Sequence, residues 1–267
     1  MFAPEWIAVF LLLGAFVGIM AGLLGIGGGG IMVPIMASVF LRNGVPADNV
    51  VHLALGTSMA SMVVTTFSSF RAHHAKGGVL WPVVRAMAPG ILLGTFLATF
   101  VASHLDSVYL AGFFALFMAY VSAQMFLDKK PKPSRQLAGG VGLFSAGAGI
   151  GGVSALVSIG GGSLTVPYLT WQNVGLKQAI GTSAAIGLPI ALAGTLGYLV
   201  NGWSHTDPAE YVFGFVYLPA VVMVSLTSYF AAPYGVRLSH WLPVPTLKKV
   251  FAVLLLLLSL RMLLVVL

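Results

Sequence analysis

Two short glycine runs carry the residues best placed to hold a ligand. Each run is followed a few residues later by Val-Pro, and contiguous glycines are poor helix formers, so each is expected to interrupt a helix. Where a helix resumes, free N–H groups and the positive end of its dipole face the break, which favours an anion. The candidate substrate-binding residues here are Gly27, Gly28, Gly29 and Pro34 in the first run and Gly160, Gly161, Gly162, Ser163, Thr165 and Pro167 in the second.

A Gly-Thr-Ser motif follows each glycine run further along the chain. Hydroxyl groups can donate to an anion, although Ser and Thr in helices also bond back to their own backbone, and both interpretations stay open. The candidate residues are Gly56, Thr57 and Ser58 in the first copy and Gly181, Thr182 and Ser183 in the second. Two motifs repeated in the same order indicate an internal duplication, which is a common construction in transporters.

Titratable side chains are sparse and lie near the ends of the apolar segments. We consider five of them as a candidate gate or cytoplasmic mouth: His52, Arg71, His73, His74 and Lys76. A basic mouth would concentrate anions, but the same residues also fit positive-inside anchoring. All six acidic residues fall at segment ends or in loops, which argues against a cation substrate because a cation needs a partner inside the membrane.

The composition places the chain in a membrane. It has 267 residues, of which 58% are hydrophobic and 7% charged, and its mean hydropathy is +0.99. One crossing takes about 20 apolar residues, which leaves no room for a soluble catalytic domain. Without cysteine there is no disulfide, thiolate nucleophile or cysteine zinc site. The net charge of +7 comes from short clusters between apolar runs, so no nucleic-acid partner is expected.

The apolar pattern predicts an all-α polytopic membrane protein. We expect two inverted repeats with about eight full transmembrane helices and two short broken or re-entrant segments. The division is residues 1–127 for the first repeat, 128–136 for a cytoplasmic linker and 137–267 for the second repeat. The expected apolar segments are 5–24, 31–42, 50–70, 82–103, 108–127, 137–158, 163–173, 178–200, 210–233 and 247–267.

The two short segments, 31–42 and 163–173, decide the topology. If neither crosses, the repeats are parallel and Lys and Arg are only weakly biased to one side. If both cross, the repeats are inverted, and every Lys and Arg except Arg42 and Arg261 lies inside. We therefore predict the inverted arrangement, with both termini outside.

Two other classes of function are disfavoured by context. Gly25 to Gly30 matches the dinucleotide pattern G-x-G-x-x-G, but an apolar helix precedes it where a strand is required. An intramembrane serine hydrolase using Ser163 or Ser183 would need a base within reach, and no His, Lys or carboxylate lies deep in a helix. We expect no enzyme activity, no cofactor and no metal.

The motifs together resemble the sulfite exporter TauE/SafE family. The resemblance rests on GLLGIGGGGIMVP, ALGTS and RAHHAKGG in the first half and on VSIGGGSLTVP and AIGTSAAIGLP in the second. It implies an inner-membrane permease for small sulfur-containing or organic anions such as sulfite, sulfonates and sulfoacetate, often working as an exporter. The family's basic-His-Gly ending carries onto His73 or His74 with Gly77, and the second half has no counterpart.

The expected function is a secondary transporter that works by alternating access at the glycine breaks. An anion channel with the same pore is the alternative, because both would use helix dipoles and backbone donors. The expected partners are a small anionic substrate and the lipid bilayer, while the sequence leaves the oligomeric state open.

Overall fold

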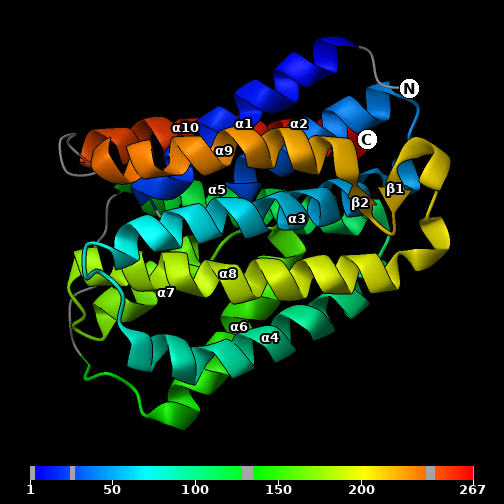
Figure 1. The fold of residues 1–267 in the computed structure, drawn as a ribbon. Helices are drawn as coiled ribbons and strands as arrows, with labels where there is room; N and C mark the ends of the chain where they lie inside the picture. The colour runs from blue at the N-terminus through cyan, green and yellow to red at the C-terminus, as the bar shows by residue number, and fades with distance from the viewer. Residues whose placement is uncertain (1–3, 25–27, 128–134, 239–243, 267) are drawn as a thin grey trace.

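Helices form almost the whole molecule (Figure 1). The computed structural model describes residues 4–24, 28–127, 135–238 and 244–266. Its helices are α1 (Pro4–Leu24), α2 (Gly29–Arg42), α3 (Ala47–His74), α4 (Trp81–Ser103), α5 (Ser107–Leu127), α6 (Gly140–Val157), α7 (Gly162–Trp171), α8 (Leu176–Asn201), α9 (Leu218–Leu238) and α10 (Val244–Val266). The predicted all-α class is confirmed.

The long helices have the dimensions of membrane crossings. Within the described residues, seven helices are long and apolar enough to span a bilayer, and α10 is a further helix of 23 residues. In contrast, α2 has 14 residues and α7 has 10. At 1.5 Å per residue these two are about 21 and 15 Å long, short of a hydrocarbon core of about 30 Å. The chain is therefore an integral membrane protein with two half-length helices.

Both half-length helices begin at the glycine runs. Gly28 precedes α2 with a φ of 83°, a left-handed conformation that suits glycine, and Gly161 precedes α7. No side chain caps either helix start, so the first N–H groups of α2 and α7 point towards the breaks. The helix before the second break, α6, ends at Val157 and is followed by Ser158, which is left-handed with a φ of 48°.

The expected segment 210–233 is wrong at its beginning. The helix there is α9, which starts at Leu218 and runs through Pro233 to Leu238. The residues before it form two short 3₁₀ turns, η1 (Trp203–His205) and η2 (Pro208–Glu210), and a hairpin of β1 (Val212–Phe213) with β2 (Val216–Tyr217). The hairpin turns at Gly214, whose φ is +56°, so these apolar residues leave the helical path before α9 begins.

The helices pack as two groups that run in opposite directions. On one side α1 and α9 run parallel, since Gly14 packs on Val224 and Gly22 on Ala232. Helix α3 runs with them, because Thr65 bonds Ser228 at 2.7 Å and Lys76, just after α3, bonds Val236. On the other side α4 and α6 run parallel, with Gly90 packed on Phe144 and Gly94 on Ala148. Helix α8 runs with these two, because Thr182 bonds Leu80 and Gly197 packs on Thr99. Across the middle α3 and α8 are antiparallel, because early α3 meets late α8 and late α3 meets the middle of α8 (Figure 1).

Glycines lie where several of the long helices approach each other closely. Gly14, Gly18 and Gly22 of α1 lie against the backbone of α9, where an added Cβ would overlap main-chain atoms. A second seam joins α4 to α6 through glycines on both helices: Gly90, Gly94, Gly147 and Gly151. Small residues at such spacing let transmembrane helices approach closely.

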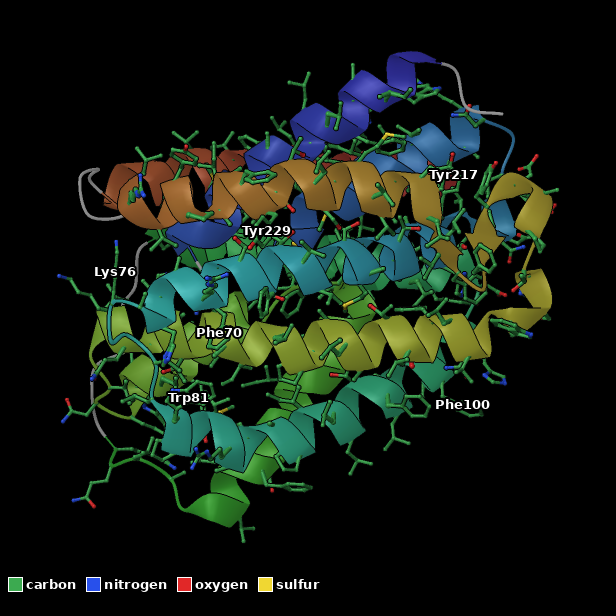
Figure 2. All side chains as sticks on the ribbon, viewed as in Figure 1. Phe70, Lys76, Trp81, Phe100, Tyr217 and Tyr229 are labelled. Atoms are coloured by element: carbon green, nitrogen blue, oxygen red, sulfur yellow. The ribbon has the colours of Figure 1, made fainter. Side chains whose placement is uncertain are left out.

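Most charged side chains of the described residues lie near the two ends of the bundle. At one end α3 and α9 end and α4 and α8 begin. This basic end carries Arg71, Lys76, Arg85, Lys177 and Arg237, with Arg135 over the Trp171 ring shortly before α8. At the other end α2 and α4 end and α3, α5 and α9 begin. This acidic end carries Asp48, Asp106, Asp207 and Glu210 together with Arg42. Figure 2 shows Lys76 at the basic end, far along the bundle from Tyr217.

Candidate functional site

The two glycine breaks meet in the middle of the bundle. A Cβ added to Gly29, at the start of α2, would overlap the carbonyl oxygen of Ser158, at the end of α6. The Ser158 hydroxyl donates to the Ser58 hydroxyl of α3 at 2.9 Å and lies 3.7 Å from the sulfur of Met62. The structure therefore brings the paired glycine motifs and one of the Gly-Thr-Ser serines to one place.

The second break is lined with hydroxyl groups. Ser163 and Thr165 lie in the first turn of α7 with exposed fractions of 8% and 0%, and neither hydroxyl has a hydrogen-bond partner. A Cβ at Gly161 would lie 3.1 Å from the Thr165 hydroxyl and 3.4 Å from the Ser183 carbonyl oxygen. Thr165 thus points back at the N-terminus of its own helix. Gly160 and Gly162, also predicted, flank this position in the chain.

The first break is packed with apolar side chains. A Cβ on Gly28 would overlap Val17, and one on Gly30 would lie 2.6 Å from the Met118 methyl and 3.4 Å from Leu255. Gly27, also predicted as a site residue, lies outside the described residues. Apart from Ser158 beside Gly29, the described start of α2 is therefore lined by apolar side chains, whereas the start of α7 carries two hydroxyls without partners.

The threonines of the Gly-Thr-Ser motifs are bonded to the other half of the chain. The Thr57 hydroxyl accepts the backbone N–H of Tyr217 at 3.0 Å, directly before α9. The Thr182 hydroxyl accepts the backbone N–H of Leu80 at 2.9 Å, directly before α4. The adjacent glycines match this role, because Gly56 lies against Phe215 and Gly181 against Gly78. These four motif residues hold the chain that enters α9 and α4.

The two prolines lie inside the half-length helices. Pro34 is buried in α2 and Pro167 is half-buried in α7. Proline cannot donate a backbone hydrogen bond, which leaves the carbonyl one turn earlier without its helical partner. The carbonyl of Pro34 accepts the Ser38 hydroxyl at 2.7 Å. Both prolines stand beyond the first turn, behind the breaks.

The candidate gate residues lie at the ends of the bundle, away from the breaks. The His52 ring nitrogens contact the Ala102 carbonyl at 3.0 Å and the Ser107 hydroxyl at 3.4 Å, near the acidic end. His73 contacts the Gly22 carbonyl at 3.2 Å at the basic end. Three more residues share that end: Arg71, which is exposed, His74, which stacks on Phe70, and Lys76, which donates to the Val236 carbonyl.

Sequence reasoning missed two serines beside the second break. Ser158 ends α6 and reaches α3, while Ser154, one turn earlier, is 1% exposed and its hydroxyl has no partner. The available signal was position, since Ser158 stands two residues before the glycine run and Ser154 four residues before Ser158. Within the described residues no cluster of His, Asp or Glu is arranged to hold a metal.

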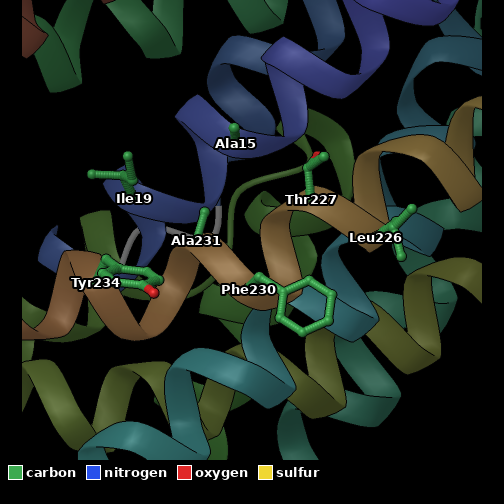
Figure 3. A pocket seen from close by; sticks show the side chains of 7 residues that line it. All are labelled: Ala15, Ile19, Leu226, Thr227, Phe230, Ala231 and Tyr234. Carbon is green, nitrogen blue, oxygen red and sulfur yellow. The ribbon is translucent and has the colours of Figure 1, made fainter.

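An open groove between α1 and α9 is separate from these breaks (Figure 3). Its lining is apolar, and Leu226, Phe230 and Tyr234 on its wall are more than half exposed. In a membrane-spanning bundle such side chains face lipid. The groove offers no donor set for an anion.

Comparison with known sequences identifies the family. The family model described as sulfite exporter TauE/SafE matches residues 10–262, nearly the whole chain. The chain belongs to this family. A Haemophilus influenzae protein named probable membrane transporter protein is 37% identical over 96% of this chain and 98% of its own length. A Xylella fastidiosa protein with the same name is 31% identical over 75% and 77%, and one from Methanocaldococcus jannaschii is 24% identical over 87% and 86%.

The match confirms the resemblance drawn from the motifs. No solved structure matches the chain. This TauE/SafE protein is a membrane transporter, and the names of its family and relatives indicate transport in place of catalysis. The expectation that it is not an enzyme is confirmed on that ground.

Proposed function

We propose that this TauE/SafE protein exports small sulfur-containing or organic anions, such as sulfite, sulfonates or sulfoacetate, across the inner membrane. The observation that carries the proposal is the place where the two broken helices meet. Buried hydroxyls without partners stand there at the start of a helix, and the positive end of that helix dipole faces the same break. The family description supports sulfite as the first substrate to test.

Neutral donors suit a site from which the substrate must also leave. The segments around the second break, residues 154–165 and 183–187, contain no charged side chain. Hydroxyls and N–H groups stabilise an anion without the strong attraction of a desolvated fixed cation. Export of one negative charge from an inside-negative cell gains about 2.3 kcal/mol per 100 mV, so export needs no coupling ion.

Alternating access is the proposed mechanism, and we infer that the two halves are inverted repeats. The support is the packing of corresponding helices. The first helix of the first half, α1, packs on the fourth helix of the second half, α9, and the first helix of the second half, α6, packs on the fourth helix of the first half, α4. The antiparallel pair of α3 and α8, which carry the two Gly-Thr-Ser motifs, agrees with this relation. Transporters of this construction bind substrate at the interface between repeats.

The test is transport by protein reconstituted in liposomes on a solid-supported membrane. We expect a saturable current after a sulfite jump from wild-type protein and none from Gly161→Leu, because leucine would fill the break. Gly112→Leu is the matched control, since a Cβ at Gly112 meets nothing within 4 Å. Gly28→Leu is a poorer test, because its left-handed φ adds backbone strain.

Near-normal current from a folded Gly161→Leu protein would remove the proposed site. No current for any anion, with no counterflow of labelled substrate, would refute anion transport. The channel alternative is distinguished by the same preparation, since a channel gives single-channel currents and no counterflow.

A further inference from the structure

The two glycine breaks are alike in sequence but opposite in chemistry. Aligning IGGGGIMVP with IGGGSLTVP places Gly30 opposite Ser163 and Met32 opposite Thr165. Continuing the alignment backwards places Ser158 opposite Gly25. Each hydroxyl of the second break therefore has a glycine or a methionine as its counterpart in the first.

The packing separates the two breaks in the same way. Beside the start of α2 lie Val17, Met118 and Leu255. The polar neighbour of Gly29 there, Ser158, belongs to the second break and already bonds Ser58. Beside the start of α7 lie the unpartnered hydroxyls of Ser163 and Thr165. A buried hydroxyl that makes no hydrogen bond costs free energy, so two of them at one helix start are best explained by a ligand that accepts from both.

We propose that the anion site is one-sided: the second break supplies its donors through the first turn of α7, Ser163 and Thr165. The first break lines the site with apolar side chains and supplies no side-chain hydrogen-bond donor from its own residues. This inference rests on the proposed function, because it assumes that an anion occupies the place where the breaks meet. It narrows the site from both glycine runs to one.

The donor set also defines the charge of the ligand. The cost of removing an ion from water rises with the square of its charge, and the segments 154–165 and 183–187 hold no cation to offset it. The site therefore takes a singly charged oxyanion with several acceptor oxygens and rejects a dianion of similar size. Among the proposed substrates this selects hydrogensulfite and monosulfonates and excludes sulfoacetate, which carries two negative charges at neutral pH. Methanesulfonate is the monoanionic probe, and sulfate is the dianionic competitor.

The experiment compares Thr165→Val and Ser163→Ala with wild type. Neither change removes a hydrogen bond from the unliganded protein, so thermal stability without ligand should stay at the wild-type value or rise. The methanesulfonate concentration needed for half-maximal thermal stabilisation, and the KM of the methanesulfonate current, should rise about 10-fold or more in each variant. Excess sulfate at constant ionic strength should leave the KM unchanged.

Thr95→Val is the matched control. Thr95 is also fully buried with an unpartnered hydroxyl, but it lies on α4 against Gly151, away from the start of α7. Its substitution should leave methanesulfonate binding and KM unchanged. An equal loss in Thr95→Val, or wild-type binding in both α7 variants, would overturn the one-sided site, and effective competition by sulfate would overturn its charge selectivity.

The two proposals fail in different ways. Binding that depends on Thr165 in a protein that carries no current would refute transport and keep the one-sided site. A wild-type current with an unchanged KM in both α7 variants would keep transport and refute the one-sided site. If wild-type protein neither binds nor carries methanesulfonate, both are wrong for this class of anion.

Discussion

The hydroxyl groups near this site fall into two sets: those that already make a hydrogen bond within the protein and those that make none. Thr57 and Thr182 accept backbone N–H groups from the segments that lead into α9 and α4, so their hydrogen bonds are made before any ligand arrives. Ser163 and Thr165 have no such partner. The same residue types in the same region therefore have two roles, one in holding the fold and one in the proposed contact with the anion.

Thr57→Val and Thr182→Val should each destabilise the protein by about 1–3 kcal/mol, because each leaves a backbone N–H without its acceptor. We expect lower melting temperatures in detergent for both variants and an unchanged KM for the transported anion. Thr66→Val is the control, since the Thr66 hydroxyl bonds only within its own helix, to the Met62 and Val63 carbonyls. A raised KM at wild-type stability would show that these threonines contact the substrate.

At the level of elements, the long helices are held together by glycine seams and the site by half-length helices. The seam between α4 and α6 puts Gly151 against the backbone of Ile91, while Gly149 on the same helix meets nothing within 4 Å. The distinction comes from helix periodicity, which turns residues two apart to different faces. The seams set the spacing of the long helices around α2 and α7.

Gly151→Leu should therefore lower stability strongly and Gly149→Leu only slightly. An added Cβ at Gly151 would lie 2.6 Å from the Ile91 carbonyl oxygen, so α4 and α6 would have to separate. Overpacking of this kind costs about 1–3 kcal/mol and often more against backbone. Thermal unfolding of the two purified variants measures the difference, and equal melting temperatures would contradict the described seam.

At the level of the whole molecule, charge distinguishes the two ends of the bundle. The basic end carries Arg71, Lys76 and Lys177, and the acidic end carries Asp48 and Asp207. Lys and Arg are retained on the cytoplasmic side of membrane proteins, so we expect the basic end to face the cytoplasm. An anion leaving the cell would then enter from the basic end and leave past the acidic end, where repulsion favours its release.

A reporter fused to the C-terminus tests this orientation. Because α10 begins near the basic end and runs through its length to the other end, the inverted arrangement places the C-terminus outside. Alkaline phosphatase fused there should be active and green fluorescent protein dark, with the reverse pattern for fusions in the 128–136 linker. A fluorescent C-terminal fusion would contradict the orientation.

The sequence alone determined the class of protein and the place of the breaks. About 20 apolar residues per crossing and contiguous glycines are local properties, so the all-α class, the half-length helices and the pairing of motifs could be predicted from composition and spacing. The family resemblance followed from the same motifs. The start of α9 could not be predicted in this way, because the apolar residues Val212 to Tyr217 form a hairpin that turns at Gly214 and are not part of the helix.

Only the tertiary structure decided which motif residues remain available for a ligand. The sequence offers the hydroxyls of Thr57 and Thr165 alike as candidate donors, but one accepts an N–H from a residue 160 positions away and the other has no partner. Likewise, only the tertiary structure shows that Met118 and Leu255, from distant helices, crowd the first glycine run. Hydrogen bonding and packing depend on neighbours that folding brings together, and local sequence does not specify those neighbours.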